Sequence, residues 1–109
     1  MITIKKLNKT YGKRKIQVFE DNKKLGEITE FWHWICLSNK ENHDILRKVA
    51  IENLWWLLHS DNIGEDYTEL EAWEEKIERW DKGHSYGANN ESLFFPGEKE
   101  IALNSINNK

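Results

Sequence analysis

The chain has 109 residues, a formal net charge of −3, six tryptophans and one cysteine. A chain of this length is expected to form one domain. Such a domain can bury enough surface for a single hydrophobic core without disulfides or a structural metal. One cysteine excludes an intrachain disulfide and a multi-cysteine zinc site, and it fits a reducing compartment. No apolar run is long enough to span a bilayer, and MITIKKLNKTYGKRK lacks the apolar core of a signal peptide. We therefore expect a cytoplasmic protein.

The charge is unevenly distributed along the chain. Residues 1–30 carry eight Lys/Arg and four Asp/Glu, whereas residues 31–109 carry eight and fifteen. Within the acidic part, residues 61–81 hold nine Asp/Glu against Lys76 and Arg79. Such a distribution disfavours nucleic acid as a partner of the acidic part and favours basic partners.

The N-terminal residues predict a small antiparallel sheet. ITI alternates, and KIQVFE, DNKK and LGEI are typical of a strand, a turn and a strand. The register of the DNKK turn stays open, because loops of different lengths each pair some apolar residues well. EFWHWICLS fits either a continuing strand or a short helix capped by Thr29, and we favour the helix.

Residues 43–59 predict the main core helix, capped by Asn42 or Asp44 and stopped by SDNIG. One broad face is apolar, with Trp56 and Ile45 at its edge: Leu46, Val49, Ala50, Ile51, Leu54, Leu57 and Leu58. We expect Leu54 and Leu57 to be the most buried. Asn53 also falls on this face, so its amide needs hydrogen-bond partners. Trp55 falls in the middle of the polar face, so it is expected to point away from the core.

A further helix is predicted in TELEAWEEKIERWDKG. Thr68 and Glu71 form a capping box, and Gly83 is a C-terminal stop. The apolar stripe is narrow and consists of Leu70, Trp73, Ile77 and Trp80. We therefore expect this helix on the outside of the domain, with one exposed acidic flank formed by Glu71, Glu74, Glu75 and Glu78.

After Gly83, HSYGANN predicts a loop and LFFPGEKEIALN predicts a strand, a Pro-Gly turn and a strand. The fold class expected is α+β, with a small antiparallel sheet from N-terminal and C-terminal hairpins packed on two or three helices. The single domain, 1–109, then divides into a basic β-hairpin region (1–28), a helical acidic body (29–83), a loop and β-hairpin (84–104) and a polar tail (105–109).

Catalytic chemistry finds little support in the sequence. His33 and Cys36 would share a helical face and could form a nucleophile or two metal ligands, but a lone cysteine among aromatic residues is more often a buried hydrophobe. His59 fits a helix C-terminus, and His84 fits a solvated loop. No calcium loop, phosphate-binding loop or nucleophile elbow is present. We predict no catalytic residue, metal or cofactor. A small enzyme or ligand-binding domain that uses these His/Cys residues remains an alternative.

Two binding interpretations remain. A nucleic-acid-associated accessory protein would use the basic residues around Tyr11, namely Lys5, Lys6, Lys9, Lys13, Arg14 and Lys15. The favoured interpretation is protein binding, with Trp55 as an apolar anchor beside the acidic flank, unless another element covers Trp55.

No stretch of the sequence matches the motif of a specific family. By size and charge alone, the chain resembles small single-domain inhibitors of microbes and phages, such as immunity proteins that block a toxin and inhibitors of a defence nuclease. That resemblance implies a basic protein partner, a toxin or nuclease that acts on nucleic acid. The oligomeric state stays open.

Overall fold

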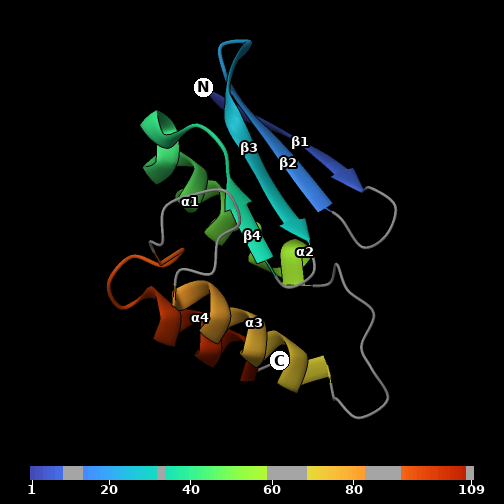
Figure 1. Cartoon of the computed structure of the whole chain (residues 1–109), viewed down its shortest axis with the longest axis vertical. Helices are drawn as coiled ribbons and strands as arrows, with labels where there is room; N and C mark the ends of the chain where they lie inside the picture. Colours follow the sequence, from blue (N-terminus) through green and yellow to red (C-terminus); the bar gives the residue numbers. More distant parts are fainter. Residues whose placement is uncertain (9–13, 32–33, 59–68, 83–91, 108–109) are drawn as a thin grey trace.

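The fold is α+β, as expected, with a four-stranded antiparallel sheet (Figure 1). The computed structural model describes residues 1–8, 14–31, 34–58, 69–82 and 92–107. The strands follow chain order across the sheet and are β1 (Ile2–Asn8), β2 (Arg14–Glu20), β3 (Lys23–Phe31) and β4 (Trp34–Leu37). Its inner face carries the buried side chains of Ile16, Val18, Ile28, Ile35 and Leu37.

The predicted turn in DNKK is confirmed, and its geometry settles the register. Asp21 and Asn22 both have positive φ, 49° and 71°, which is the type I′ geometry that matches the twist of a hairpin. Glu20 consequently pairs with Lys23. A bulge beside Val18 leaves Leu25 without a residue opposite it in β2, and Leu25 is buried in the core.

The short helix predicted from Thr29 is wrong, because this segment continues β3 and returns as β4. Thr29 pairs with Cys36, and Phe31 pairs with Trp34. β-branched and aromatic residues favour a pleated surface, which supports the strand. The alternation is hidden in the sequence because Glu30, a charged residue, takes an inner position opposite Ile35 and is fully buried.

The predicted core helix is present in two pieces, α1 (His43–Glu52) and α2 (Leu54–Leu58), after the 3₁₀ turn η1 (Lys40–Asn42). Asn53 interrupts it, with its side-chain Nδ2 donating to the Val49 carbonyl at 2.8 Å. This hydrogen bond provides a partner for the side-chain amide of Asn53, which the sequence predicts on an apolar face. The apolar face is confirmed, and Leu57 is fully buried as expected. The expectation for Leu54 is wrong, because its exposure of 8% exceeds the 0% of Leu46 and Ala50.

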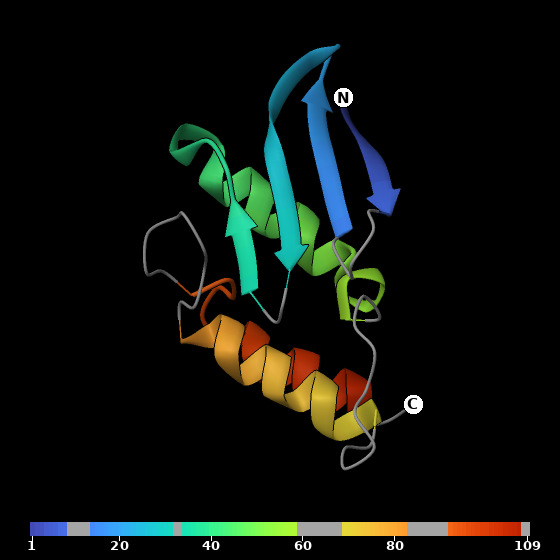
Figure 2. The same ribbon diagram turned by 45° about the vertical axis from the view of Figure 1, so that its right-hand side comes forward.

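A second layer is formed by α3 (Glu69–Asp81) and α4 (Glu98–Asn107), which lie side by side beyond the side of the sheet where β3 ends and β4 begins (Figures 1 and 2). The C-terminal hairpin predicted within 84–104 is therefore wrong, and residues 105–107 of the predicted tail belong to the helix. Ala102 and Ile106 are buried at helical spacing. Pro96-Gly97 precedes a helix whose first turn is acidic, which suits the helix dipole.

A buried ion pair joins the two layers. Glu30 on β3 and Lys76 on α3 have side-chain exposures of 0% and 1%, and Lys76 Nζ lies 3.6 Å from Glu30 Oε1. Lys76 Nζ also donates to the Leu58 carbonyl at 3.1 Å, at the end of α2. The sheet, α2 and α3 therefore meet at one ammonium group.

Breaking this pair from one side should destabilise the domain strongly. We expect Lys76→Met to lower the free energy of unfolding by about 3–5 kcal/mol, because the Glu30 carboxylate would stay buried without its cation. Replacing both residues by Met should restore most of the loss. Urea denaturation measures both effects, with Lys82→Met at an exposed position as the control. Equal stability of the two lysine variants would contradict the role given to the pair.

Candidate functional site

The candidate site is the outer face of α3, and the core contacts of the helix set its direction. Trp73, Ile77 and Trp80 are buried, with exposures of 9%, 0% and 1%, and Lys76 is buried among them. The buried face is therefore wider than the apolar stripe in the sequence. The helical repeat places the predicted acidic residues on the other side, which we call the acidic face: Glu71, Glu74, Glu75 and Glu78.

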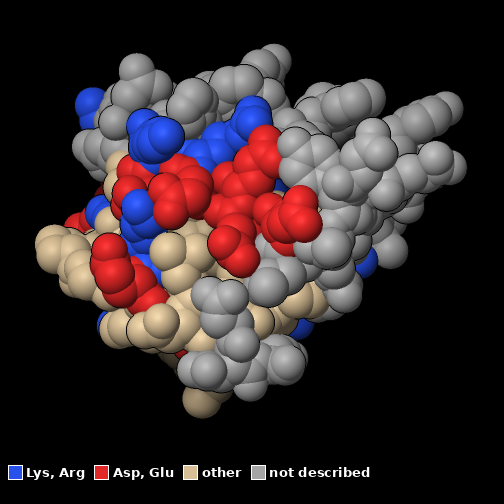
Figure 3. All heavy atoms as spheres, turned by 90° about the horizontal axis from the view of Figure 1, so that it is seen from below, with Lys and Arg blue, Asp and Glu red and all other residues tan. Residues whose placement is uncertain are grey.

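Seen from the side of α3 and α4, acidic side chains gather in the middle of the surface, with lysine and arginine side chains beside them (Figure 3). Two of the four glutamates have local cations. Arg79 donates to Glu75 at 3.0 Å, and Lys99 of α4 lies 2.9 Å from Glu78 and 3.7 Å from Asp81. The hydrogen bond with Glu78 raises the pKa of Lys99. The acidic face is thus partly neutralised at one end.

Glu71 and Glu74 complete the acidic face. Glu71 is exposed and Glu74 is half-buried. Glu74 makes no ion pair with any other residue in the described part of the chain.

Trp55 lies against the buried side of α3. Trp55 is half-buried, and its ring meets Trp73 edge to face, with centroids 5.1 Å apart and an interplanar angle of 80°. Trp73 lies on the buried side of α3, so Trp55 does not project freely from a polar helix face as the sequence indicated. Trp73 of α3 covers part of the Trp55 ring, a contact that a helical wheel of residues 43–59 alone cannot show.

The neighbouring Trp56 packs on basic residues of the sheet. The Arg14 guanidinium lies 4.9 Å from the centroid of its ring, and Lys6 Nζ lies 5.6 Å from it. Arg14 Nη1 also donates to the Trp56 carbonyl. These distances suit cation–π contacts, so the two cations stabilise the packing of α2 against the sheet.

The basic N-terminal residues are not brought onto one surface. Directly paired residues of neighbouring strands share a face. Lys6 pairs with Ile16 and Arg14 pairs with Glu30, so both lie on the inner face. Lys5 pairs with Gln17 and lies on the outer face, as Lys15 does. Lys9 and Lys13 are outside the described residues.

Lys15 takes part in a polar network on the outer face of the sheet. Glu27 accepts from Lys24 Nζ at 2.8 Å and from Gln17 Nε2 at 3.0 Å, and Lys15 Nζ lies 3.4 Å from its other oxygen. The Lys24 bond, helped by Gln17, lowers the pKa of Glu27 from 4.5 to about 2. Lys15 is therefore already paired.

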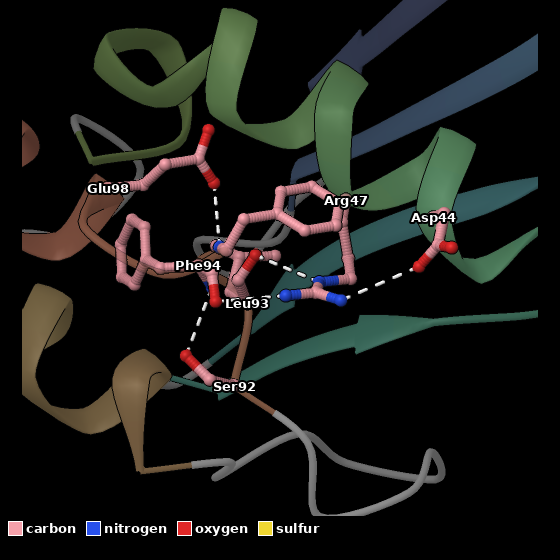
Figure 4. A network of polar contacts seen from close by, with 7 residues as sticks. Asp44, Arg47, Ser92, Leu93, Phe94 and Glu98 are labelled. Atoms are coloured by element: carbon pink, nitrogen blue, oxygen red, sulfur yellow. Dashed lines mark hydrogen bonds and ion pairs between the residues drawn. The ribbon is translucent and has the colours of Figure 1, made fainter.

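An arginine that the sequence analysis did not single out holds the C-terminal segment in place (Figure 4). Arg47 of α1 donates to the carbonyls of Leu93 at 3.2 Å and Phe94 at 2.9 Å. Its guanidinium lies 3.8 Å from the centroid of the Phe95 ring. Because all of these partners are distant in sequence, no local pattern could reveal them. The role is structural, since α1 thereby anchors the approach to α4.

The enzymatic alternative gains no support from Cys36. Its side chain is half-buried on β4, and burial raises the pKa of its thiol. The thiolate, which is the nucleophile and metal ligand, is thereby disfavoured. His33, His59 and His84 lie outside the described residues. Among the residues that the structure does describe, no three His/Cys/Asp/Glu side chains gather as metal ligands.

Comparison of the chain with models of known families, with curated proteins and with solved structures finds no match. In the described segments, no helix has both the length and the apolar character needed to cross a membrane.

The Glu27 network predicts a pH dependence of stability. Because the folded pKa of Glu27 lies below its ordinary value, its ionised form contributes stability above about pH 4.5, and the contribution is lost as the pH falls to about 2. We expect Glu27→Gln to be less stable than the parent at neutral pH, with the difference shrinking across that window. Urea titrations at stepped pH measure it, and Glu41→Gln in η1 is the exposed control. A pH-independent difference would contradict the assignment.

Proposed function

We propose that the chain is a small non-enzymatic inhibitor that binds a basic protein partner through the acidic face of α3. The observation that carries the proposal is the division of α3 into two sides. One side is buried against the sheet and α4, and the other presents Glu71, Glu74, Glu75 and Glu78. A rigid helix with its carboxylates on one side loses little entropy when a partner binds.

Buried and local contacts determine how much of this charge faces solvent. Lys76, one of two basic residues within α3, is paired inside the domain with Glu30 and so does not neutralise the outer glutamates. Arg79 and Lys99 hold Glu75 and Glu78 through partly buried ion pairs at the surface of the domain. A basic partner can replace these cations. It gains both contact energy and long-range steering from the acidic face.

The chemistry of the face favours a partner that itself binds phosphates. A toxin or nuclease that acts on nucleic acid needs basic residues around its active site to hold the backbone. A row of carboxylates on a helix complements such a surface and competes with the nucleic acid for it. This is the mode of action proposed for the chain, as an inhibitor of the immunity-protein or phage-inhibitor type.

Charge reversal on the acidic face should slow association. With the partner recovered by co-purification from the native host, we expect Glu74→Lys combined with Glu78→Lys to lower the association rate about tenfold at low salt. The salt dependence of the rate should fall as well, because steering is screened by ions. Stopped-flow mixing over a salt series measures both. Glu41→Lys, an exposed reversal on η1, should leave the rate nearly unchanged.

Trp55 gives a second test of the proposed function. If the partner also touches the exposed part of this ring, Trp55→Ala should speed dissociation of the complex. Loss of the contact with Trp73 should lower the stability of the free domain in either case. A domain that is less stable but dissociates at the parent rate would assign Trp55 to the support of α3 alone. An association rate that the charge reversal leaves unchanged at low salt would contradict the proposed function.

A further inference from the structure

Two cations of the sheet lie beside one aromatic ring and have no carboxylate partner. Lys6 of β1 and Arg14 of β2 are diagonal neighbours on the inner face, a spacing of roughly 7 Å that long side chains bridge. Lys6 Nζ lies 5.6 Å and the Arg14 guanidinium 4.9 Å from the centroid of the Trp56 ring. Neither side chain forms an ion pair with any residue in the described part of the chain. Like charges held this close repel each other, so an anion between them is favoured.

The nearby acidic residues do not neutralise these two cations. Glu30 lies directly opposite Arg14 on the inner face, but its ion pair is with Lys76 of α3. The Arg14 Nη1 donates instead to the Trp56 carbonyl. Glu52, one helical turn before Trp56, is exposed and is ion-paired with no residue that the structure describes. This end of the inner face therefore keeps an excess of positive charge, which attracts anions from solution.

Arg14 also has an unmet hydrogen-bonding requirement. Its Nε is buried and finds no hydrogen-bond partner among the described residues. Buried polar groups are nearly always paired, and an orphaned donor is commonly explained by a bound ion or water. The Arg14 side chain as a whole is only half-buried and Lys6 is exposed, so an anion from solvent can reach both cations.

We propose that Lys6 and Arg14 form a phosphate site beside Trp56, which binds the dianionic phosphate group of inorganic phosphate or of a small phosphorylated molecule. A phosphate group carries a charge of about −1.5 to −2 at neutral pH, which two cations balance, whereas a carboxylate balances only one. Its several oxygens accept from the guanidinium fork of Arg14 and from the Lys6 ammonium group together. The phosphate site uses no residue of the acidic face and rests on no part of the proposed function.

The experiment follows the Trp56 indole N–H of the full, ¹⁵N-labelled chain by NMR during titration with inorganic phosphate. The titration is made at about pH 7.5, where phosphate is mostly dianionic, and sodium chloride keeps the ionic strength constant. We expect a saturable shift with a dissociation constant of about 1 mM or lower. A parent chain without a saturable shift up to about 10 mM phosphate would overturn the proposal.

Lys6→Met and Lys5→Met form a matched pair, because the two lysines are adjacent on β1, both exposed and on opposite faces of the sheet. Lys6→Met keeps an apolar stem beside Trp56 and should weaken phosphate binding about tenfold, since a charge-assisted hydrogen bond is lost. Lys5→Met removes the same charge and should leave the dissociation constant nearly unchanged. An equal loss in the two variants would overturn the proposal, because binding would then follow net charge alone.

A second titration with adenosine monophosphate distinguishes the two sources of the phosphate group. Affinity at least tenfold higher than that of inorganic phosphate, and sensitive to Lys6→Met, would identify a nucleotide whose base also contacts the Trp56 region. Equal affinities would identify the phosphate group alone as the ligand. Binding of a single-stranded oligonucleotide without terminal phosphates, where neither small phosphate binds, would overturn the proposal and indicate a nucleic-acid surface.

Discussion

The buried contact between Glu30 and Lys76 constrains the packing of both layers. Two charges removed from water are tolerated only when they meet and when further hydrogen bonds satisfy them. Glu30 can meet Lys76 only if β3 continues past Thr29 and if α3 turns this lysine toward the sheet. The Leu58 carbonyl, which accepts from Lys76 Nζ, adds the end of α2 to the same requirement.

Aromatic and arginine contacts also hold the second layer against the first. Trp55 meets Trp73 edge to face, so α2 supports α3 from the side of the core. Arg47 binds the carbonyls of Leu93 and Phe94 and stacks on the Phe95 ring, which holds the approach to α4 against α1. Each contact joins segments far apart in the chain. The second layer is thereby fixed to the first at several points.

This packing has consequences for where partners can bind. Since α3 buries Trp73, Ile77 and Trp80, its glutamates are directed outward and share one face. The pleat of the sheet acts in the opposite way on the basic N-terminal residues, because Lys5 and Lys6 fall on different faces. Acidic residues are thus concentrated and basic residues are dispersed. That contrast is the reason why we propose a basic protein partner and not nucleic acid.

Local chemistry alone determined several features of this protein. A turn within DNKK, the apolar face of residues 46–58 and the helix around Trp73 follow from turn preference and helical periodicity, which need only near neighbours. The exact register of the hairpin does not follow from them. The tertiary structure decided the rest. Glu30 interrupts the alternation of apolar residues that would have predicted β3, and Lys76 makes the buried face of α3 look narrower in the sequence than it is. Both are charged residues at core positions, and each has its partner in another layer. Pro96-Gly97 suits a hairpin turn as well as a helix entry, and only the packing of Ala102 and Ile106 against the core selects the helix. The cover over Trp55 likewise comes from α3, since a helical wheel describes one helix and carries no record of what packs against it.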